Sequence, residues 1–357
     1  MNSTQVLGTT EIVAPTAKNI KLLVWDLDNT LWHGTLLEGD RLELRDGIRS
    51  TLQTLDQRGI LHSIASKNDY DLAMAKLTEF GLSDFFLYPQ INWNSKAANL
   101  QTIVKSINIG LDAVAFIDDE PFEREEVSQT LPQVLTLDSH ELSGLCDRTE
   151  FIPSCITDES AQRRIMYLAD IHRKRAEEEF VGPSEEFLAT LNMTFSIAKA
   201  QELDLKRAEE LTLRTHQLNT TGETYSYDDL NTFRQSSDHL LLVAGLEDRF
   251  GSYGKIGLAL VQKTTTVWTI KLFLMSCRVM SRGVGTIFIN HLLMQAREAG
   301  VRLLAPFRPN GRNRMMLITY KFAGFREIAR SEEQVMLEHD LTSIQPHPKF
   351  VNVCIAS

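Results

Sequence analysis

Short apolar runs alternate with amphipathic stretches along the first part of the chain. Apolar runs with the length of buried strands lie at residues 21–25, 60–65, 85–88 and 113–117. Stretches with the apolar spacing of helices lie at 46–58, 69–80 and 96–107, and Pro121 stands where a further helix is expected to begin. Strands of about five residues that alternate with helices predict βαβ units, and therefore a parallel sheet with helices on both faces.

The pattern changes after a charged helical stretch at 158–179 and the dipeptide Gly182-Pro183, which we interpret as a linker. Runs typical of strands follow at 193–200, 239–245, 255–263, 267–276, 301–305 and 325–330. Helical stretches lie at 202–214 and 227–235, and a third helix is expected from the Arg-Gly-Val-Gly turn at 282–285 to residue 299. Central antiparallel strands, followed by a strand, a glycine turn and a helix, predict an α+β domain.

This organisation suits a soluble globular protein of 357 residues, of which 43% are hydrophobic and 24% charged. Two domains are favoured over one at this length. The sequence therefore predicts four parts: a polar leader at 1–19, an α/β domain at 20–150, a helical linker at 151–185 and an α+β domain at 186–357.

Composition excludes several classes of protein. A net charge of −10 argues against a general nucleic-acid binder. The apolar runs, such as 240–246 and 272–275, are too short to span a bilayer, and the first nineteen residues lack the pattern of a signal peptide. The four cysteines form no CxxC pair and no metal-ligand spacing with the histidines. We therefore expect a cytoplasmic protein in a reducing compartment, without a membrane or nucleic-acid partner.

The charge is unevenly distributed along the chain. Between residues 271 and 330, two lysines and nine arginines stand against two glutamates, a net charge of +9. One interpretation is an Arg-rich helical face that is simply solvated. The other is a docking face for phosphate groups or for an acidic partner.

Two carboxylates follow the first predicted strand as Asp26-Leu27-Asp28. In an α/β sheet, chemistry is placed outside the carboxyl ends of the strands. A pair of carboxylates spaced in this way can divide a phosphoryl transfer between them. One attacks phosphorus and the other, two residues on, protonates the leaving oxygen. An Asp-x-Asp at a strand end taken alone is more often part of a turn.

Three further features occupy equivalent places. The second strand is followed by Ser66, whose hydroxyl can hold a phosphoryl oxygen, and Lys96 opens a later helix, where it can neutralise a transferring group. The fourth strand ends in Asp118 and Asp119, whose oxygens suit Mg²⁺ alongside Asp26. Four features in order, each at a strand end or a helix start, favour a phosphoryl-transfer site over chance turns.

The second half contains one cysteine in an unusual setting. Cys277 lies at the end of a predicted strand and is followed by Arg278 and Arg282, next to an expected helix N-terminus. A lone cysteine is usually a small buried hydrophobe. Cations and a helix dipole, however, lower a thiol pKa and favour the nucleophilic thiolate. Backbone N–H groups of the turn at 282–285 can also bind a phosphate.

The arrangement of Asp26, Asp28, Ser66, Lys96 and the pair at 118–119 resembles the haloacid-dehalogenase superfamily of aspartyl phosphotransferases over residues 20–138. The resemblance implies a Rossmann-like domain with a parallel sheet, and the short stretch from 30 to 46 leaves room for little or no cap. It further implies that Asp26 is the nucleophile, Asp28 the acid/base, and Ser66 and Lys96 the phosphate ligands. Mg²⁺ would be held by Asp26, the Asp28 backbone carbonyl and one of the two aspartates at 118–119.

The turn at 282–285 resembles the acyl-CoA pyrophosphate loop of the N-acetyltransferase fold, which implies an N-acetyltransferase-like second domain. Five strings resemble FkbH-like proteins of polyketide assembly: WDLDNTLW at 25–32, FIDD at 116–119, RTHQLN at 214–219, GSYG at 251–254 and SCRV at 276–279. This resemblance extends over residues 20–340. It implies a glyceryl transferase that takes 1,3-bisphosphoglycerate, removes its phosphates and loads D-glycerate onto the phosphopantetheine thiol of a holo acyl carrier protein.

By the same resemblance, Cys277 holds the glyceryl group as a thioester. Arg278 and Arg282 are then expected to bind the substrate phosphates, and the basic stretch to dock the acidic carrier. Because one acyl group must visit both sites, we expect the domains to face each other across a shared cleft.

The chain departs from the family pattern at three positions: His216 replaces Asn, Ser281 replaces Gly and Gly285 replaces Glu. The role expected for His216 is a substrate contact or a base for the thiol, and a satisfied histidine at a helix end is an equal alternative. Three other functions stay open: a plain Mg²⁺-dependent phosphatase with a recruiting second domain, a non-catalytic docking protein, and an acyl-CoA-dependent N-acyltransferase.

Overall fold

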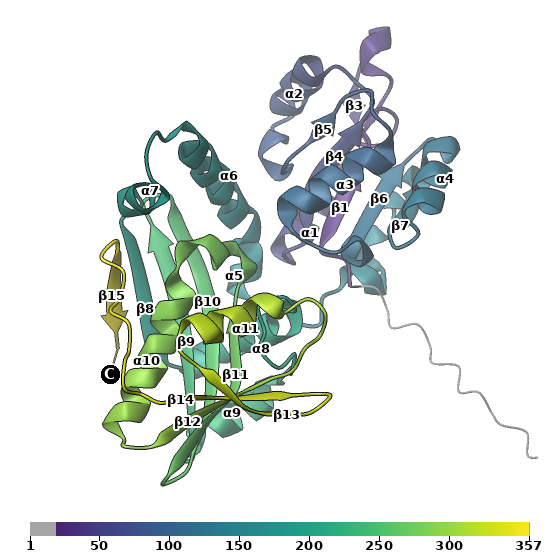
Figure 1. Ribbon diagram of the computed structural model, residues 1–357. Coiled ribbons are helices and arrows are strands. Elements are labelled where there is room, and N and C mark those ends of the chain that lie inside the picture. The colour runs from purple at the N-terminus through teal and green to yellow at the C-terminus, as the bar shows by residue number, and fades with distance from the viewer. Residues whose placement is uncertain (1–18, 357) are drawn as a thin grey trace, which may run out of the picture. The chain divides into compact units, whose positions relative to one another are not determined.

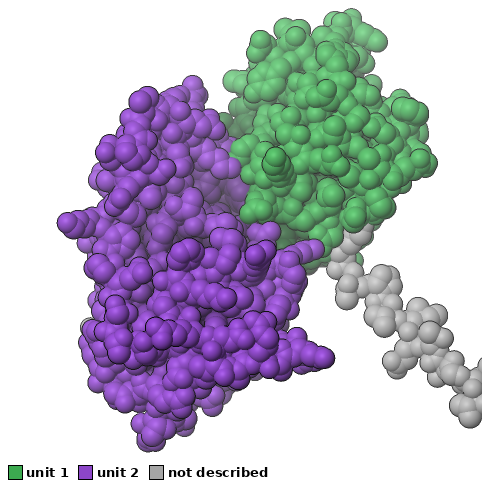
Figure 2. Space-filling view, viewed as in Figure 1, with its two compact units in different colours: residues 1–154 green, residues 155–357 purple. Residues whose placement is uncertain are grey.

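The computed structural model describes residues 19–356 and divides into two compact units, residues 1–154 and 155–357 (Figure 2). Residues 1–18 of the expected polar leader lie outside the described residues. The stretch 151–185, expected as a linker, is divided by this boundary, and its two helices belong to the second unit.

The first unit is built on a parallel five-stranded sheet in the order β5-β4-β1-β6-β7 (Figure 1). Its strands are β1 (Leu22–Trp25), β4 (Leu61–Ser66), β5 (Gln90–Ile91), β6 (Val114–Asp118) and β7 (Leu135–Asp138). Its helices are α1 (Ile48–Gln57), α2 (Tyr70–Glu79), α3 (Lys96–Ile107) and α4 (Pro121–Thr130). Every residue of β1, β4 and β6 is buried, which explains their nearly continuous apolar runs. The predicted parallel α/β sheet is confirmed.

One predicted strand is wrong. The run at 85–88 was expected to be a strand. Its first residue, Phe85, instead ends a 3-10 helix, Ser83–Phe85, and within the run only Phe86 forms an isolated bridge, to His62. Tyr88 has a φ of 51° and is followed by Pro89, which cannot donate to a ladder, so the strand forms only beyond them as β5. The apolar side chains at 86 and 87 are buried in the core without being in a strand.

A short ribbon follows β1 in place of a cap. It consists of β2 (Trp32–His33), the 3-10 helix η1 (Leu36–Glu38) and β3 (Glu43–Leu44), with β2 and β3 antiparallel. Helix α1 begins directly afterwards, so this connection contains no further domain, as expected.

The second unit contains an eight-stranded mixed sheet in the order β13-β14-β12-β11-β10-β9-β8-β15. Its strands are β8 (Met193–Lys199), β9 (His239–Asp248), β10 (Gly251–Lys263), β11 (Val267–Met275), β12 (Arg302–Phe307), β13 (Arg326–Arg330), β14 (Val335–His339) and β15 (Val351–Ile355). The central pairs from β8 to β11 are antiparallel, while β12 runs parallel to β11 and β15 parallel to β8. The predicted α+β fold class is confirmed. Strands β14 and β15 were not predicted.

Seven α-helices accompany this sheet within the described residues. They are α5 (Asp158–Ala161), α6 (Arg163–Glu179), α7 (Ser184–Thr190), α8 (Leu205–Arg214), α9 (Tyr227–Gln235), α10 (Val284–Glu298) and α11 (Arg314–Phe322). The single helix expected at 158–179 is broken at Gln162 into α5 and α6, and α7 and α11 were not predicted. No helix between residues 19 and 356 is both long and apolar enough to cross a membrane.

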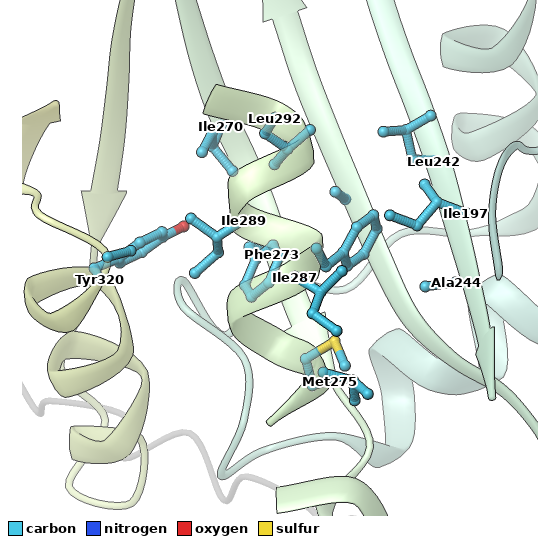
Figure 3. Close-up of a cluster of buried hydrophobic side chains, with 14 of the residues drawn as sticks. Ile197, Leu242, Ala244, Ile270, Phe273, Met275, Ile287, Ile289, Leu292 and Tyr320 are labelled. Carbon is cyan, nitrogen blue, oxygen red and sulfur yellow. The ribbon is translucent and has the colours of Figure 1, made fainter. Parts of the chain in front are cut away.

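Helices cover both faces of the second sheet. Along β9, Leu242 and Ala244 join the cluster under α10, which Figure 3 shows with Phe273 and Ile289 around the same helix. The alternate residues of β9, Leu241 among them, pack with α8 and α9. Because both faces of the sheet are buried, the strand sequences are nearly continuous apolar runs and do not alternate strictly between apolar and polar residues.

Strands β11 and β12 pair only from Val267 to Thr269 and from Arg302 to Leu304. Beyond this pairing, the segment 218–221 bonds to both. The Met275 N–H donates to the Leu218 carbonyl (2.9 Å), the Thr220 N–H donates to the Phe273 carbonyl (3.1 Å), and the Arg308 N–H donates to the Thr220 carbonyl (3.0 Å). Residues 218–221 therefore occupy the backbone hydrogen-bonding groups at the end of β11, just before Cys277.

Helix α6 is anchored within the second unit by Arg173, which is fully buried. Its guanidinium donates to both carboxylate oxygens of Asp248 at 2.7 and 2.9 Å, to Asp170 at 2.7 Å and to the Gly251 carbonyl at 3.1 Å. It also lies 3.8 Å from the centre of the Tyr253 ring. Removing one partner of such a network leaves an uncompensated buried charge.

Arg173→Met is therefore expected to destabilise the second unit by about 3–5 kcal/mol, as for other broken buried ion pairs. The matched control is Arg175→Met on the same helix, where the side chain is mostly exposed and its pair with Glu179 contributes about 0.3–0.5 kcal/mol. Chemical denaturation, in which unfolding is monitored by hydrogen exchange in β9 and β10, measures the difference in stability between the two variants. Equal stability of the two variants would contradict the role of Arg173 as an anchor.

Candidate catalytic sites in the two units

The first candidate site lies where the carboxyl ends of β1, β4 and β6 meet. Asp26 directly follows β1, Ser66 ends β4 and Asp118 ends β6, with Asp119 next to it. Oxygen atoms of Asp26, Asp118 and Asp119 lie within 4.8 Å of one another. Parallel strands bring these residues together because their carboxyl ends share one edge of the sheet.

Lys96, the first residue of α3, reaches into this group and is 2% exposed. Its Nζ donates to Asp26, to Asp118 at 3.0 Å and to the Ala65 carbonyl at 3.0 Å, and it lies 3.1 Å from Glu123. Burial by itself lowers the pKa of Lys96, but the three carboxylates raise it above its usual value. The ammonium is therefore kept charged at neutral pH and offsets part of the repulsion among the acids.

The carboxylates remain only partly compensated. Burial, followed by the charge of Asp26, raises the pKa of Asp118 to about 7 although Lys96 acts in the opposite direction. The pKa of Asp119 is raised for the same two reasons, while Thr30 donates to its carboxylate at 3.2 Å. Three clustered oxygen ligands of this kind suit a hard divalent cation, whose charge would relieve their repulsion.

Asp28 lies in a different environment, on the ribbon side of the site. One carboxylate oxygen accepts hydrogen bonds from the Trp32 indole at 2.8 Å and the Leu36 N–H at 3.1 Å, and the other accepts from Asn68 at 2.9 Å. Burial raises the pKa of Asp28 despite these donors, and the charge of Asp26 adds to the effect. An aspartate with a raised pKa is suited to holding and releasing a proton.

Two contributors to this site were not predicted. Glu123, in the first turn of α4, pairs with Lys67 at 2.7 Å and with Lys96 at 3.1 Å. Burial raises the pKa of Glu123, but the two lysines outweigh it and lower the value. Asn68 follows Ser66 by two residues. Its position just after a strand end was the one feature of the sequence that could have indicated a place in this site.

The second candidate site is formed around Cys277 at the end of β11. This half-buried residue opens the 3-10 helix η8 (Cys277–Arg282), after which Gly283 adopts a φ of 72° and α10 begins at Val284. The predicted strand end before Cys277, and the glycine turn and helix start after it, are therefore present in the chain.

The two arginines near Cys277 are engaged with protein groups. Arg278 donates to the Tyr253 carbonyl at 2.8 Å, and its other terminal nitrogen lies 2.9 Å from the sulfur of Met166. Arg282 is buried and lies 3.4 Å from Glu177. Arg278 is half-buried and lies next to the cysteine in the chain, whereas the guanidinium of Arg282 is withdrawn from solvent.

His216 is exposed, and its backbone carbonyl accepts a hydrogen bond from Asn310 at 3.1 Å. It lies in the connection from α8 to the segment 218–221. Asn313 also anchors this connection through a bond of 2.9 Å to the Asn219 carbonyl. The loop backbone is thus held by asparagines.

A cluster of arginines around Glu210 was also not predicted. Arg163 and Arg207 both bind the Glu210 carboxylate. Burial alone raises the pKa of Glu210, but the surrounding guanidiniums lower it to about 2. Single arginines on amphipathic helices give no local signal of such a cluster, because only the packing of α5 and α6 against α8 brings them together.

A cavity of about 640 Å³ lies between residues 159–166 and the strands β8, β9 and β10. Its lining includes Glu159, Met166, Ser196, Glu247 and Lys255, and Cys277 is not part of it. The cavity is therefore distinct from both predicted sites. Met166 nevertheless lines the cavity and also contacts Arg278.

No protein-family model matches the chain, and no curated protein matches it. Among solved structures, it is similar to the N-terminal phosphatase-domain part of BF1531 from Bacteroides fragilis, complexed with Mg, at 27% identity and a TM-score of 0.31. That match covers 42% of this chain and 39% of that chain. It is also similar to the ribosomal-protein-S18-alanine N-acetyltransferase from Escherichia coli, at 15% identity and a TM-score of 0.34, over 42% of this chain and 96% of that chain.

A third similar structure is YncA from Salmonella typhimurium, described as a putative acetyltransferase with its cofactor acetyl-CoA. It is 14% identical, with a TM-score of 0.32, over 43% of this chain and 98% of that chain. The class of this protein is defined by its own sheets and side chains: an α/β unit with a carboxylate–lysine site, followed by an α+β unit with a cysteine at a strand end.

The carboxylate site predicts a pH-dependent affinity for Mg²⁺. Because the pKa of Asp118 is raised to about 7, a proton occupies this group below that pH and competes with the cation. Affinity measured by calorimetry is expected to rise with pH, by up to about tenfold per unit below pH 7, and to level off above it.

Asp118→Asn is expected to weaken Mg²⁺ binding and to flatten this pH profile. Glu125→Gln is the matched control, because this exposed carboxylate lies on the neighbouring helix α4 and outside the group. A pH-independent affinity in the unsubstituted protein would contradict the assignment of Asp118 to the cation site.

Proposed function

We propose that this chain transfers a D-glyceryl group from 1,3-bisphosphoglycerate to the phosphopantetheine thiol of an acyl carrier protein and removes phosphate at a separate site. The observation that carries the proposal is the presence of two different chemistries in one chain. One unit has a carboxylate–lysine site at the carboxyl edge of a parallel sheet, and the other has a cysteine at a strand end beside a helix start. The sequence resemblance to FkbH-like proteins supplies the substrate and the carrier.

In the first unit, Asp26 is the proposed nucleophile for the phosphate ester at C3. Its carboxylate forms a bond to phosphorus as the ester P–O bond breaks, and Asp28 donates its proton to the leaving alkoxide. Water then attacks phosphorus of the aspartyl phosphate, the bond from phosphorus to the Asp26 oxygen breaks, phosphate and the free carboxylate are released, and Asp28 takes up the proton of the water. The raised pKa of Asp28 supports this assignment, because burial shifts this group toward its protonated form.

Lys96 and Ser66 are proposed to bind the phosphoryl oxygens. Lys96 supplies a fixed positive charge within a buried group, where electrostatic stabilisation is stronger than in water. When bound, Mg²⁺ would supply further charge neutralisation, and Asp26, Asp118, Asp119 and the Asp28 backbone carbonyl are the proposed ligands.

In the second unit, the thiolate of Cys277 is proposed to attack the C1 carbonyl of the acyl phosphate. A C–S bond forms, the C–O bond to phosphate breaks, and the glyceryl group is held as a thioester. The carrier thiolate then displaces Cys277 by a second thioester exchange. Arg278 and Arg282 were expected to bind phosphate, and of these the half-buried Arg278 is the better placed.

An acyl-CoA-dependent N-acyltransferase is disfavoured by the segment 218–221. An extended pantetheine arm that added to β11 as a strand would require the backbone groups of Phe273 and Met275. Those groups already bond to Leu218 and Thr220. The pantetheine arm of a carrier protein meets the same constraint, so it would have to reach Cys277 from beyond this occupied stretch.

A plain Mg²⁺-dependent phosphatase with a recruiting second unit is the second candidate. The favouring observation is that the contacts of Asp26, Asp28 and Lys96 are all made within the first unit, so that phosphate hydrolysis needs no residue of the other. In this alternative Cys277 is dispensable.

The carrier is proposed to dock on the basic stretch around the start of α11. Arg312 and Arg314 are exposed there, beside the exposed side chain of Met315. Basic groups around an exposed apolar residue are suited to an acidic partner, with the charges acting mainly on the association rate.

Intact-protein mass spectrometry with Mg²⁺ and freshly generated 1,3-bisphosphoglycerate tests the transfer. A glyceryl adduct that holo carrier protein discharges is expected on the unsubstituted chain, and a phosphoglyceryl adduct is expected to accumulate in Asp26→Asn. Cys277→Ala is expected to form no adduct, whereas Cys155→Ala, which removes another half-buried thiol of the same unit, is expected to behave normally. Carrier loading at the normal rate by Cys277→Ala would refute the covalent mechanism.

Charge reversal of Arg312 and Arg314 tests the docking surface. The double substitution to Glu is expected to raise the KM for the carrier by about tenfold at low salt, with a smaller effect at high salt and normal formation of the glyceryl adduct. The matched control reverses two exposed charges on α6, Lys174 and Arg175. An equal effect of both double variants would show that the basic stretch has no specific role.

A further inference from the structure

The Glu210 carboxylate is fully engaged by groups other than Arg214. Glu210 is 2% exposed, and one of its oxygens pairs with Arg163. The other accepts from Arg207 at 2.7 Å and from the Thr157 hydroxyl at 2.9 Å. A carboxylate with this many donors has little remaining capacity for another guanidinium.

Arg214, the last residue of α8, is the guanidinium that remains. Its Nη1 lies 3.7 Å from Oε1 of Glu210, which is beyond hydrogen-bonding distance. Its side chain is 24% exposed. Around it, Arg163, Arg207 and Arg214 are opposed by Glu210 and by Glu159, which pairs with Arg207 at 2.7 Å. Among these five groups, three guanidiniums face two carboxylates.

Burial and then the charge of Arg163 lower the pKa of Arg214 to about 9. The lowered pKa reflects the free-energy cost of keeping this guanidinium charged beside other guanidiniums. A bound anion would remove that cost, because it would supply the acceptors that the protein does not.

Arg214 and Cys277 are connected by a short path through the fold. The chain runs four residues from Arg214 to Leu218, whose carbonyl accepts from the Met275 N–H at 2.9 Å, two residues before Cys277. Tyr167 lies close enough to both for the charges of Cys277 and Arg214, with those of Arg278 and Arg163, to act on its phenol. The contact of Arg278 with Met166, the neighbour of Tyr167, links the same elements.

We propose that Arg214, together with Arg278, forms an anion subsite beside Cys277 that receives the phosphate leaving C1 when the thiolate attacks an acyl phosphate. The identity of this anion rests on the proposed function. As the C–S bond forms, the C–O bond breaks and its electron pair stays on the phosphate oxygen. A guanidinium fork stabilises that oxygen by charge and by paired N–H donors. Arg214 is thus an added substrate-contacting residue of the cysteine site.

The subsite is tested by the charge selectivity of Cys277 alkylation in the full chain. Iodoacetate is an anion and iodoacetamide its neutral analogue, so the ratio of their rates measures the subsite apart from the reactivity of the thiol. Peptide mass spectrometry distinguishes Cys277 from the other three cysteines, and inorganic phosphate serves as the competing anion.

Arg214→Gln is expected to lower the iodoacetate rate by about tenfold and to leave the iodoacetamide rate within about twofold. Phosphate is expected to protect Cys277 from iodoacetate in the unsubstituted protein and not in this variant. Arg214→Lys, which keeps the charge but loses the fork, is expected to give an intermediate ratio. Lys206→Gln removes one exposed positive charge from the same helix and is expected to match the unsubstituted protein.

An unchanged ratio in Arg214→Gln, or an equal loss with both reagents, would overturn the subsite. A selective, phosphate-protected Cys277 that forms no glyceryl adduct with 1,3-bisphosphoglycerate would instead refute the proposed function and retain the subsite. An adduct without charge selectivity would retain the function and refute the subsite.

Discussion

The first unit depends on one constraint, the burial of Lys96 among carboxylates. Its ammonium contacts Asp26, Asp118 and Glu123 within a group that is withdrawn from water. Without it, three like charges would be held close together at a cost of several kcal/mol. With it, burial and the remaining repulsion from Asp26 still raise the pKa of Asp118 to about 7. The site is therefore stable enough to fold and still favours a divalent cation.

In the second unit, the clustered charges are positive guanidiniums rather than negative carboxylates. Glu210 compensates two guanidiniums closely and a third, Arg214, only at a longer distance. Partial compensation at both places leaves charge available for a ligand, a cation in one unit and an anion in the other. Sites whose charges are fully neutralised by the protein would lack this property.

Much of the first site followed from the chain because parallel strands place their carboxyl ends at one edge. Asp26, Lys96 and Asp118 were predicted from their positions at strand ends and a helix start, and α3 was predicted with the bounds it has. Glu123 was missed because an acid in the first turn of a helix is common and is explained by the helix dipole alone. The strand expected at 85–88 failed because an apolar run records burial and not backbone geometry, which Tyr88 and Pro89 interrupt.

The sequence by itself determined the two fold classes, the order of most elements and the placement of Asp26 and Cys277 at strand ends. These properties depend on local periodicity, turn residues and strand polarity. Only the tertiary structure decided that residues 218–221 extend along β11 and that Arg163, Arg207 and Arg214 share one glutamate. Both features depend on packing between segments that are distant in the chain. The hydrophobic and polar pattern of a single segment does not reveal them, because this pattern is the same whether the charged side chains face solvent or one another.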